Sequence, residues 1–160
     1  MSTITSTIAI RHARPADLAA IEQLLTDANL PTAGVGQILH ARADDFFVAE
    51  ADAGATNERM LVGVAGLEVC CNNALLRSVA VRPEWRRHAV GRDLVRRIVS
   101  EAEHRGLHAL YLLTTTAEQY FPRFGFERIE RADVAPEIAE TDEFKSACPA
   151  SAIAMKKTLA

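Results

Sequence analysis

Apolar residues recur along the chain with two different periods, and these periods predict both strands and helices. Short apolar or alternating runs bounded by turn-forming residues favour strands, whereas apolar residues three and four positions apart favour amphipathic helices. Strands are predicted over residues 8–12, 46–51, 60–70, 75–81, 109–114, 126–131 and 151–156. Helices are predicted over residues 15–28, 37–42, 90–105 and 117–124, and residues 136–147 are expected to be helical or irregular. This order of elements indicates the α/β (α+β) fold class.

Turn-forming residues link three of the predicted strands as hairpins. The polar segment 52–59 follows the strand 46–51, and Asn72-Asn73 follows the next strand as a turn pair, because asparagine tolerates a positive φ. Three hairpin-linked strands form an antiparallel meander. Residues 30–36 hold one proline and two glycines and are a predicted loop. No repeat or linker divides the 160 residues, so a single domain is expected.

The longest predicted helix, residues 90–105, has an apolar side and a basic side. Gly106 follows it and is predicted to end it as the C′ residue. A solvated face is the favoured interpretation of the arginines on the basic side. The inward positions are Val90, Leu94, Val95, Ile98, Val99 and Ala102, and the outward positions are Arg92, Arg96, Arg97, Glu101 and Arg105.

Composition narrows the class of protein. Hydrophobic residues make up 49% of the chain and charged residues 24%, which is typical of soluble globular proteins. A net charge of −3 and a pI near 6.0 disfavour a nucleic-acid-binding protein, and no apolar run approaches the roughly 20 residues that cross a bilayer. The N-terminal sequence lacks the pattern of a signal peptide. An odd number of cysteines, 3, suits a reducing compartment, so a cytoplasmic location is expected. The 5 histidines have no metal-ligand spacing, and no metal site is predicted.

One basic segment contrasts with this acidic background. Six arginines lie between Arg82 and Arg97, and His88 lies among them. In residues 86–91 the basic side chains coincide with the end of a strand, a glycine and the start of a helix. Free N–H groups and the positive end of the helix dipole favour a bound anion at such a place. The segment therefore predicts a site for a phosphorylated cofactor.

Two motifs in this part of the chain resemble those of the GCN5-related N-acetyltransferases, the GNAT superfamily. The segment VAVRP, residues 79–83, followed by RRHAVGR, residues 86–92, is similar to the acetyl-CoA signature of that family. In this signature an apolar strand precedes Gln/Arg-x-x-Gly-x-Gly/Ala at the start of a helix. The segment AEQYFPRFGF, residues 117–126, resembles a second motif, in which a short helix runs into a Gly-Phe pair. The spacing of the motifs and the order of the elements match the family over residues 8–156.

The resemblance implies a fold, a co-substrate and a set of contacts. It implies a mixed, mostly antiparallel central sheet in which the parallel strands 75–81 and 109–114 splay apart and admit acetyl-CoA. It also implies an N-acetyltransferase that acts on the amine of a small molecule, and a homodimer formed through the C-terminal strands. The implied cofactor contacts are Val79, Ala80 and Val81 along the pantetheine arm, and Arg86, Arg87, His88, Ala89, Val90, Gly91 and Arg92 around the pyrophosphate.

The sequence departs from the family pattern at two positions. Ala89 stands where the family often has glycine, and alanine is tolerated there only if its φ stays negative, with weaker packing against the phosphate. Phe121 stands where the family usually has the tyrosine that protonates the departing thiolate, and phenylalanine cannot donate a proton. Either Tyr120 or a water takes this role, or the thiolate leaves unassisted. A half-buried packing aromatic is an equal alternative for Tyr120.

Amide formation from a thioester requires a neutral amine, so a general base has to take the amine proton. Glu68 is the predicted base, because it is a carboxylate within an apolar run and burial would raise its pKa. An outward, solvated position on the strand is the alternative. Arg77 is predicted to hold a substrate carboxylate, and Ser78 to bond the thioester or the base. Thr115 is a predicted substrate contact within a cluster of three threonines, of which at least one is expected only to fill the strand.

A narrower resemblance concerns the acceptor. The segments LLRS, YLLTTTAEQYF and EFKSACPASAIAM are similar to the acetyltransferases associated with arsenic-resistance operons. This similarity implies an arsenical or phosphinic amino acid, or another toxic amine, as the acceptor. Cys148 then either binds trivalent arsenic or is a buried small hydrophobe. Two other classes stay open: a sensor that binds acetyl-CoA without turnover, favoured by Phe121, and an interaction subunit with a relic site, favoured by Ala89.

Overall fold

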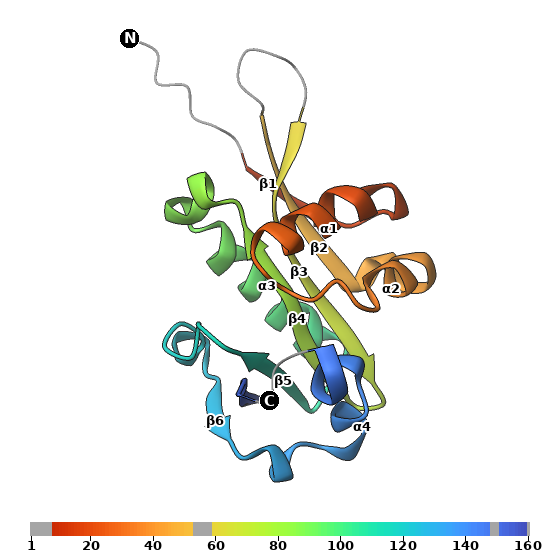
Figure 1. Ribbon diagram of the computed structural model, residues 1–160, viewed down its shortest axis with the longest axis vertical. Helices are drawn as coiled ribbons and strands as arrows, with labels where there is room; N and C mark the ends of the chain where they lie inside the picture. Colours follow the sequence, from red (N-terminus) through yellow and green to blue (C-terminus); the bar gives the residue numbers. More distant parts are fainter. Residues whose placement is uncertain (1–7, 53–58, 148–150, 160) are drawn as a thin grey trace.

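The computed structural model describes residues 8–52, 59–147 and 151–159. Its strands are β1 (Ala9–His12), β2 (Phe46–Asp52), β3 (Arg59–Cys70), β4 (Asn73–Val81), β5 (Ala109–Thr114), β6 (Glu127–Ile129) and β7 (Ile153–Thr158). They form one sheet in the order β1-β2-β3-β4-β5-β7-β6, which is antiparallel except for the β4–β5 pair (Figure 1). The predicted mixed, mostly antiparallel sheet is confirmed. Cys148 and most of the predicted turn 52–59 lie outside the described residues.

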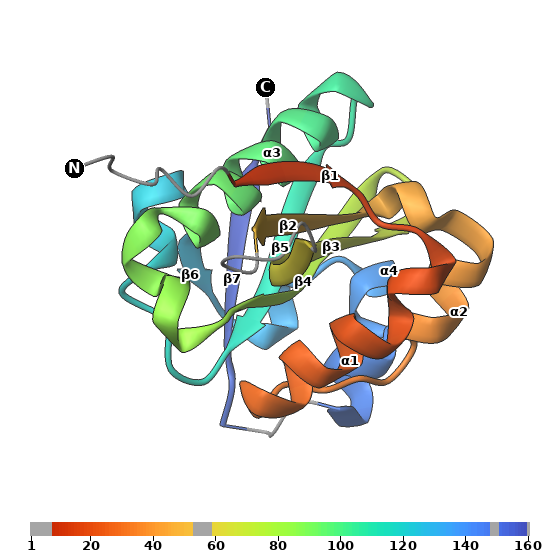
Figure 2. The same ribbon diagram turned by 90° about the horizontal axis from the view of Figure 1, so that it is seen from above.

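Helices cover both faces of this sheet. The α-helices are α1 (Leu18–Asp27), α2 (Val35–Arg42), α3 (Val90–His104) and α4 (Pro136–Ala139). α3 lies on one face, and α1 and α2 lie on the other (Figure 2). Two adjacent residues of β2 show both layers, because Phe47 packs in the core cluster of α3 and Phe46 in that of α1 and α2. No helix in the described parts of the chain is long and apolar enough to cross a membrane.

β4 changes course at Ser78, beside the predicted cofactor site. The register of β3 and β4 passes from Val64–Ala80 to Gly66–Arg77, which leaves two residues of β4 opposite one of β3. Such a bulge bends its strand, and here Ser78 takes a φ of 59°. The parallel ladder between β4 and β5 ends at the pair Leu75–Tyr111. The two strands separate beyond this pair, which confirms the predicted splay.

The hairpin between β3 and β4 turns one residue earlier than predicted. Cys70 pairs with Asn73, so the two turn residues are Cys71 and Asn72. Cys71 has the positive φ, 57°, that the prediction assigns to an asparagine. The leucine-rich run of β4 sets this register, because Leu75 and Leu76 must each face an apolar cluster.

The predicted helix over residues 117–124 is wrong for most of its length. Residues 118–120 form a turn, and only Phe121–Phe124 form a single 3-10 turn. The backbone N–H of Ala117 donates to the hydroxyl of Thr114 at 2.9 Å, so this amide is already used before any helix begins. Pro122 lacks an N–H group and fits only the first turn of a helix. In residues 136–147, one short α-helix precedes a π-helical turn, Glu143–Ala147.

Arg105 does not lie on a solvated face. Its guanidinium contacts a carboxylate oxygen of Asp45 at 2.6 Å and one of Glu101 at 3.0 Å. Asp45 is only 3% exposed and also pairs with Arg42, at 3.1 Å. A buried carboxylate requires such partners. The prediction for Arg105 is therefore corrected, since this side chain ties the end of α3 to the residues that precede β2.

Candidate active site

The basic segment after β4 forms a turn that leads directly into α3. Residues Pro83–His88 form this 3-10 turn, and Ala89 joins it to the first residue of the helix, Val90. Arg86, Arg87 and His88 are exposed, whereas Val90 is buried and anchors the helix start. The first N–H groups of α3 have no partner within the helix, so the helix dipole and three basic side chains meet at one place. This arrangement fits a bound pyrophosphate.

Ala89 joins the turn to α3 in a left-handed conformation. Its φ is 59° and its ψ is 20°, so the expectation of a negative φ is wrong. The chain has to reverse between the 3-10 turn and α3, and a left-handed residue provides this reversal. An alanine in that conformation costs about 1–2 kcal/mol relative to the right-handed one.

Tyr120 lies against the start of α3, next to Gly91. A Cβ atom at Gly91 would lie 3.2 Å from the Tyr120 hydroxyl oxygen, so glycine permits this close approach. The Arg123 guanidinium lies over the Tyr120 ring, 4.6 Å from its centroid. Burial raises the pKa of Tyr120, and the phenol therefore stays protonated at neutral pH and can donate a hydrogen bond. Tyr120 and Arg123 also line a cavity of about 470 Å³ with Thr116, Ala117, Glu118 and Gln119.

Phe121 is a core residue. Its side chain is 6% exposed, and its ring packs edge-to-face on Phe126 at a centroid distance of 5.8 Å. The departure from the family tyrosine therefore puts an apolar ring, and no proton donor, at this position.

Arg77 is the centre of a buried polar network beside the bulge. Its side chain is fully buried, and each of its nitrogens donates a hydrogen bond. Nε donates to Ser78 Oγ at 3.0 Å, one terminal nitrogen donates to Glu68 at 2.6 Å, and the other donates to the Ala33 carbonyl at 2.6 Å. The guanidinium is thus already engaged, and the predicted grip on a substrate carboxylate stays a prediction. The contacts join the loop before α2 to β3 and β4.

A second carboxylate, which no sequence pattern indicated, lies on the same guanidinium. Glu143 Oε1 is 3.6 Å from Arg77 Nε, and the Glu143 residue is 4% exposed. Burial raises the pKa of Glu143, Arg77 lowers it, and the negative charge of Glu68 raises it further. No local pattern could have revealed this residue, because its segment is short and irregular and meets β4 only in the folded chain.

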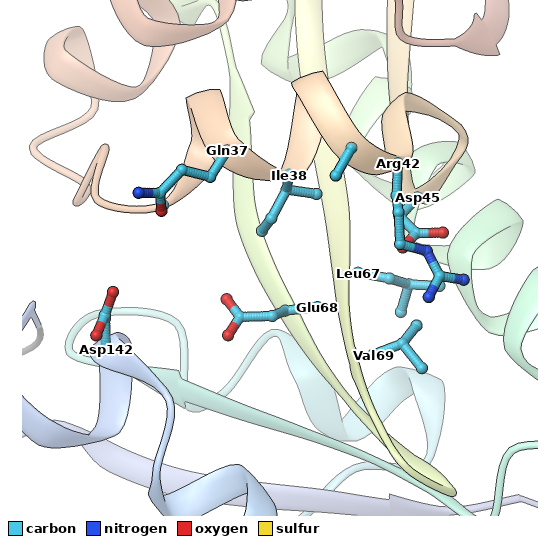
Figure 3. Close-up of a pocket in the computed structure, with 10 residues that line it drawn as sticks. Gln37, Ile38, Arg42, Asp45, Leu67, Glu68, Val69 and Asp142 are labelled. Carbon is cyan, nitrogen blue, oxygen red and sulfur yellow. The ribbon is translucent and has the colours of Figure 1, made fainter.

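Glu68 is half-buried and faces a cavity of about 250 Å³ between α2 and β3. Its carboxylate and that of Asp142 lie on the same side of this cavity, with Gln37 above them (Figure 3). Ile38, Leu67 and Val69 give the cavity apolar walls. The cavity therefore combines an apolar surface with carboxylates beside the Arg77 network.

The three threonines at the end of β5 differ in burial, and the role of Thr115 as a substrate contact stays a prediction. Thr114 is buried and its hydroxyl accepts the N–H of Ala117, which is a structural role. Thr115 and Thr116 are exposed directly after the strand. Thr116 lines the cavity beside Tyr120. The structure therefore brings together Glu68, Arg77 and Ser78 in one group and Tyr120 and Gly91 in another.

Comparison with known proteins identifies the class. The family described as "Acetyltransferase (GNAT) domain" matches residues 42–128. An amino-acid acetyltransferase of Mycobacterium tuberculosis is 31% identical over 138 residues, which cover 81% of this chain and 74% of that protein. The fold and the site define an acetyl-CoA-dependent N-acyltransferase. The chain belongs to the GNAT acetyltransferase family.

Solved structures agree in fold. A Mycobacterium tuberculosis protein in complex with CoA matches with a TM-score of 0.76 and 25% identity. The match covers 95% of this chain and 99% of that protein's chain. N-acetylglutamate synthase from Neisseria gonorrhoeae, complexed with coenzyme A and N-acetyl-glutamate, has a TM-score of 0.78 at 18% identity and covers 98% of this chain. This chain spans 36% of that synthase and 13% of an Edwardsiella ictaluri amino-acid acetyltransferase.

Proposed function

We propose that this enzyme acetylates the amine of a small amino-acid-like molecule. The observation that carries the proposal is the Arg77 network, which sets two carboxylates and a serine hydroxyl beside the bulge where β4 leaves β5. The names of the relatives support an amino acid as the acceptor. The cavity of about 250 Å³ at Glu68 suits a small molecule rather than a protein side chain on a folded surface.

Acetyl-CoA supplies an activated acetyl thioester to this site. Main-chain groups of Val79, Ala80 and Val81 would hold the pantetheine arm, because beyond Leu75 the ladder from β4 to β5 is absent. The N–H groups at the start of α3, with Arg86, Arg87, His88 and Arg92, would hold the pyrophosphate. The Tyr120 hydroxyl, which lies next to Gly91, would donate a hydrogen bond to the pyrophosphate end of the cofactor. Its position next to Gly91, at the start of α3, favours a binding role over thiolate protonation.

The acceptor is proposed to be an amino acid with an acidic side group, with arsenical and phosphinic amino acids as specific candidates. Support for these candidates comes from the resemblance of three sequence segments to acetyltransferases associated with arsenic resistance. Residues 148–150 of the most distinctive segment lie outside the described part. Contact of Arg77 with an acidic group of the acceptor stays a prediction, because the Arg77 nitrogens already donate to Ser78, Glu68 and Ala33. Thr115 would contact the acceptor directly after β5. Cys148 stays a prediction as a thiol ligand of arsenic.

Release of the CoA thiol from acetyl-CoA tests the proposal. The acceptors to be compared are the common amino acids, phosphinic and arsenical amino acids and polyamines, each with its N-acetylated form as the matched control. Thiol release with an amino acid and none with its N-acetylated form is the expected result. Release with polyamines alone would contradict the proposed acceptor.

If no acceptor of this panel causes CoA thiol release but acetyl-CoA still raises the melting temperature, the result would favour a sensor that binds the cofactor without turnover. The burial of Phe121 is the observation that favours this second candidate. The homodimer and the cytoplasmic location stay predictions of the sequence.

A further inference from the structure

Two carboxylates share the guanidinium of Arg77, and their surroundings differ. Glu68 accepts a short hydrogen bond of 2.6 Å and its side chain is 24% exposed. Glu143 approaches no closer than 3.6 Å and its side chain is 6% exposed. One arginine cannot neutralise two carboxylates, so the network as a whole holds one surplus negative charge when both are ionised. Two carboxylates in unequal environments are the arrangement from which acid–base roles are assigned in enzymes.

We propose that Glu143 is the final acceptor of the amine proton, reached through the Ser78 hydroxyl, and that Glu68 serves to hold Arg77 in place. This inference rests on the proposed function, since it assigns the proton transfer of that reaction. It replaces Glu68, the base predicted from the sequence, with a residue of the C-terminal segment.

The geometry of Arg77 Nε supports the relay. Ser78 Oγ accepts the Nε proton at 3.0 Å, and the Glu143 carboxylate lies over the same nitrogen. The Ser78 hydroxyl uses one of its two lone pairs for this bond, so its second lone pair can accept a proton and its own proton is available to another acceptor. Ser78 also precedes Val79, the first residue proposed to contact the pantetheine arm. The hydroxyl thus adjoins the segment proposed to hold the cofactor and shares Arg77 Nε with Glu143.

The proton transfer balances. As the bond between the amine nitrogen and the acetyl carbon forms, the amine proton passes to Ser78 Oγ and the Ser78 proton passes to Glu143. The carbon–sulfur bond breaks and its electron pair stays on the sulfur. Glu143 then returns its proton to that sulfur, which yields the CoA thiol and restores the carboxylate. A separate tyrosine donor at the position of Phe121 is not required.

Glu68 is less suited to this role. A proton on Glu68 would remove the charge partner at 2.6 Å from a guanidinium that is fully buried. Leaving a buried charge without its partner is strongly unfavourable. A proton on Glu143 instead cancels the surplus negative charge of the network and leaves the Arg77–Glu68 pair intact.

The other charged groups around Glu143 are engaged elsewhere. On α4 and just after it, Glu137 accepts a hydrogen bond from Asn73 at 2.6 Å, and Glu140 pairs with Lys145 at 2.6 Å. Asp142 lines the neighbouring cavity. Arg77 of β4 and Glu68 of β3 are the two charged groups that shift the pKa of Glu143, after the larger effect of burial, which raises it.

The first test compares the pH dependence of kcat in three variants. Glu143→Gln is expected to lower kcat by about 10²–10⁴-fold and to remove the acidic limb of its pH profile. Glu68→Gln should keep this limb. Glu140→Gln is the matched control, because it removes the same charge from the same segment at a side chain that is 71% exposed. It should leave kcat unchanged.

The second test measures thermal unfolding of the cofactor-free protein against pH. The pKa of Glu143 is raised in the folded state, so the folded protein binds this proton more tightly than the unfolded chain does. The stability contributed by the protonated group is therefore lost as the pH rises from the ordinary carboxyl pKa through the raised one. The melting temperature of Glu143→Gln relative to wild type should increase over this range, and that of Glu140→Gln should not.

The outcomes separate the two proposals. Wild-type turnover with an acidic limb that persists in Glu143→Gln overturns the assignment of Glu143 and leaves the proposed function standing. A melting difference that does not change with pH also overturns the assignment. If the wild-type enzyme releases no CoA with any acceptor, the proposed function fails and the proton relay fails with it.

Discussion

Ala89 carries a side chain in a backbone conformation that favours glycine, and its position at the start of α3 makes this strain measurable. With a φ of 59°, Ala89→Gly should raise the free energy of unfolding by about 1 kcal/mol. Ala20→Gly is the matched control, since Ala20 is exposed within α1 and glycine there should lower the free energy of unfolding by about 1 kcal/mol. Urea unfolding of both variants measures the two effects. A change of the same sign in the free energy of unfolding of both variants would contradict the strain at Ala89.

Tyr120 offers a second prediction at this scale, because its hydroxyl lies close to Gly91 at the start of α3. Tyr120→Phe removes one donor to a charged group and should weaken CoA binding by about 10–100-fold, the equivalent of roughly 1.5–3 kcal/mol. Its kcat at saturating cofactor should change little. Calorimetry with CoA and steady-state kinetics measure the two quantities. A loss confined to kcat would return Tyr120 to the role of proton donor.

Single residues were predictable where a local motif fixes their role. The exposed Arg86, Arg87 and His88 follow from the order of strand, basic turn and helix. Glu143 and the carbonyl of Ala33 were not predictable, because their contacts with Arg77 join segments that are far apart in the sequence. The left-handed Ala89 was missed because a steric rule favours negative φ for alanine, and the reversal of the chain overrides it.

Among the elements, the close approach of β2 and β3 is the most restrictive. A Cβ atom at Gly66 would lie 2.5 Å from the ring of Phe46, which is fully buried and cannot move away. Gly66→Ala should therefore lower the free energy of unfolding by about 1–3 kcal/mol. Denaturant unfolding measures this loss.

Gly36→Ala is the control for that experiment. A Cβ atom at Gly36 would lie 3.6 Å from the Leu18 side chain, which is an ordinary contact, and Gly36 lies within α2. The same substitution should then raise the free energy of unfolding by about 0.5–1 kcal/mol. Loss of stability in both variants would mean that the packing at Gly66 has no special role.

Periodicity predicted the long helix because it has one apolar side, and short apolar runs bounded by turn-forming residues predicted the strands, of which β2, β3 and β4 are buried on both faces. Periodicity failed over residues 117–124, where two phenylalanines, a tyrosine and a proline follow no single period. In that segment the side chain of Thr114 and the absent N–H of Pro122 decide the backbone. Periodicity also placed Arg105 in solvent. A period shows which side of a helix is apolar, but it does not show that the buried carboxylate of Asp45 pairs with Arg105 at the end of α3.

At the scale of the whole molecule, the enzyme should gain stability from its cofactor. CoA at 100 times its Kd should add about 2.7 kcal/mol to the free energy of unfolding. The gain should shrink at high salt, because the proposed pyrophosphate site uses exposed arginines. The double variant Arg86→Ala and Arg87→Ala should lose most of the shift in melting temperature, whereas Arg128→Ala, whose side chain is 70% exposed on β6, should keep it. An equal loss of the CoA-induced shift in both variants would contradict the proposed pyrophosphate site.

The early end of the β4–β5 ladder, at Leu75–Tyr111, reverses the usual distribution of local stability in a sheet. In most sheets the central strands exchange their amide protons last and the edges exchange first. Here the two middle strands separate, so the amides of β4 and β5 that face the gap beyond that pair should exchange their protons with solvent as readily as those of an outer strand. The amides that pair with β3 and β7 should stay protected. Occupation by the cofactor should slow this exchange at the centre, while the rates at β1 and β6 stay the same.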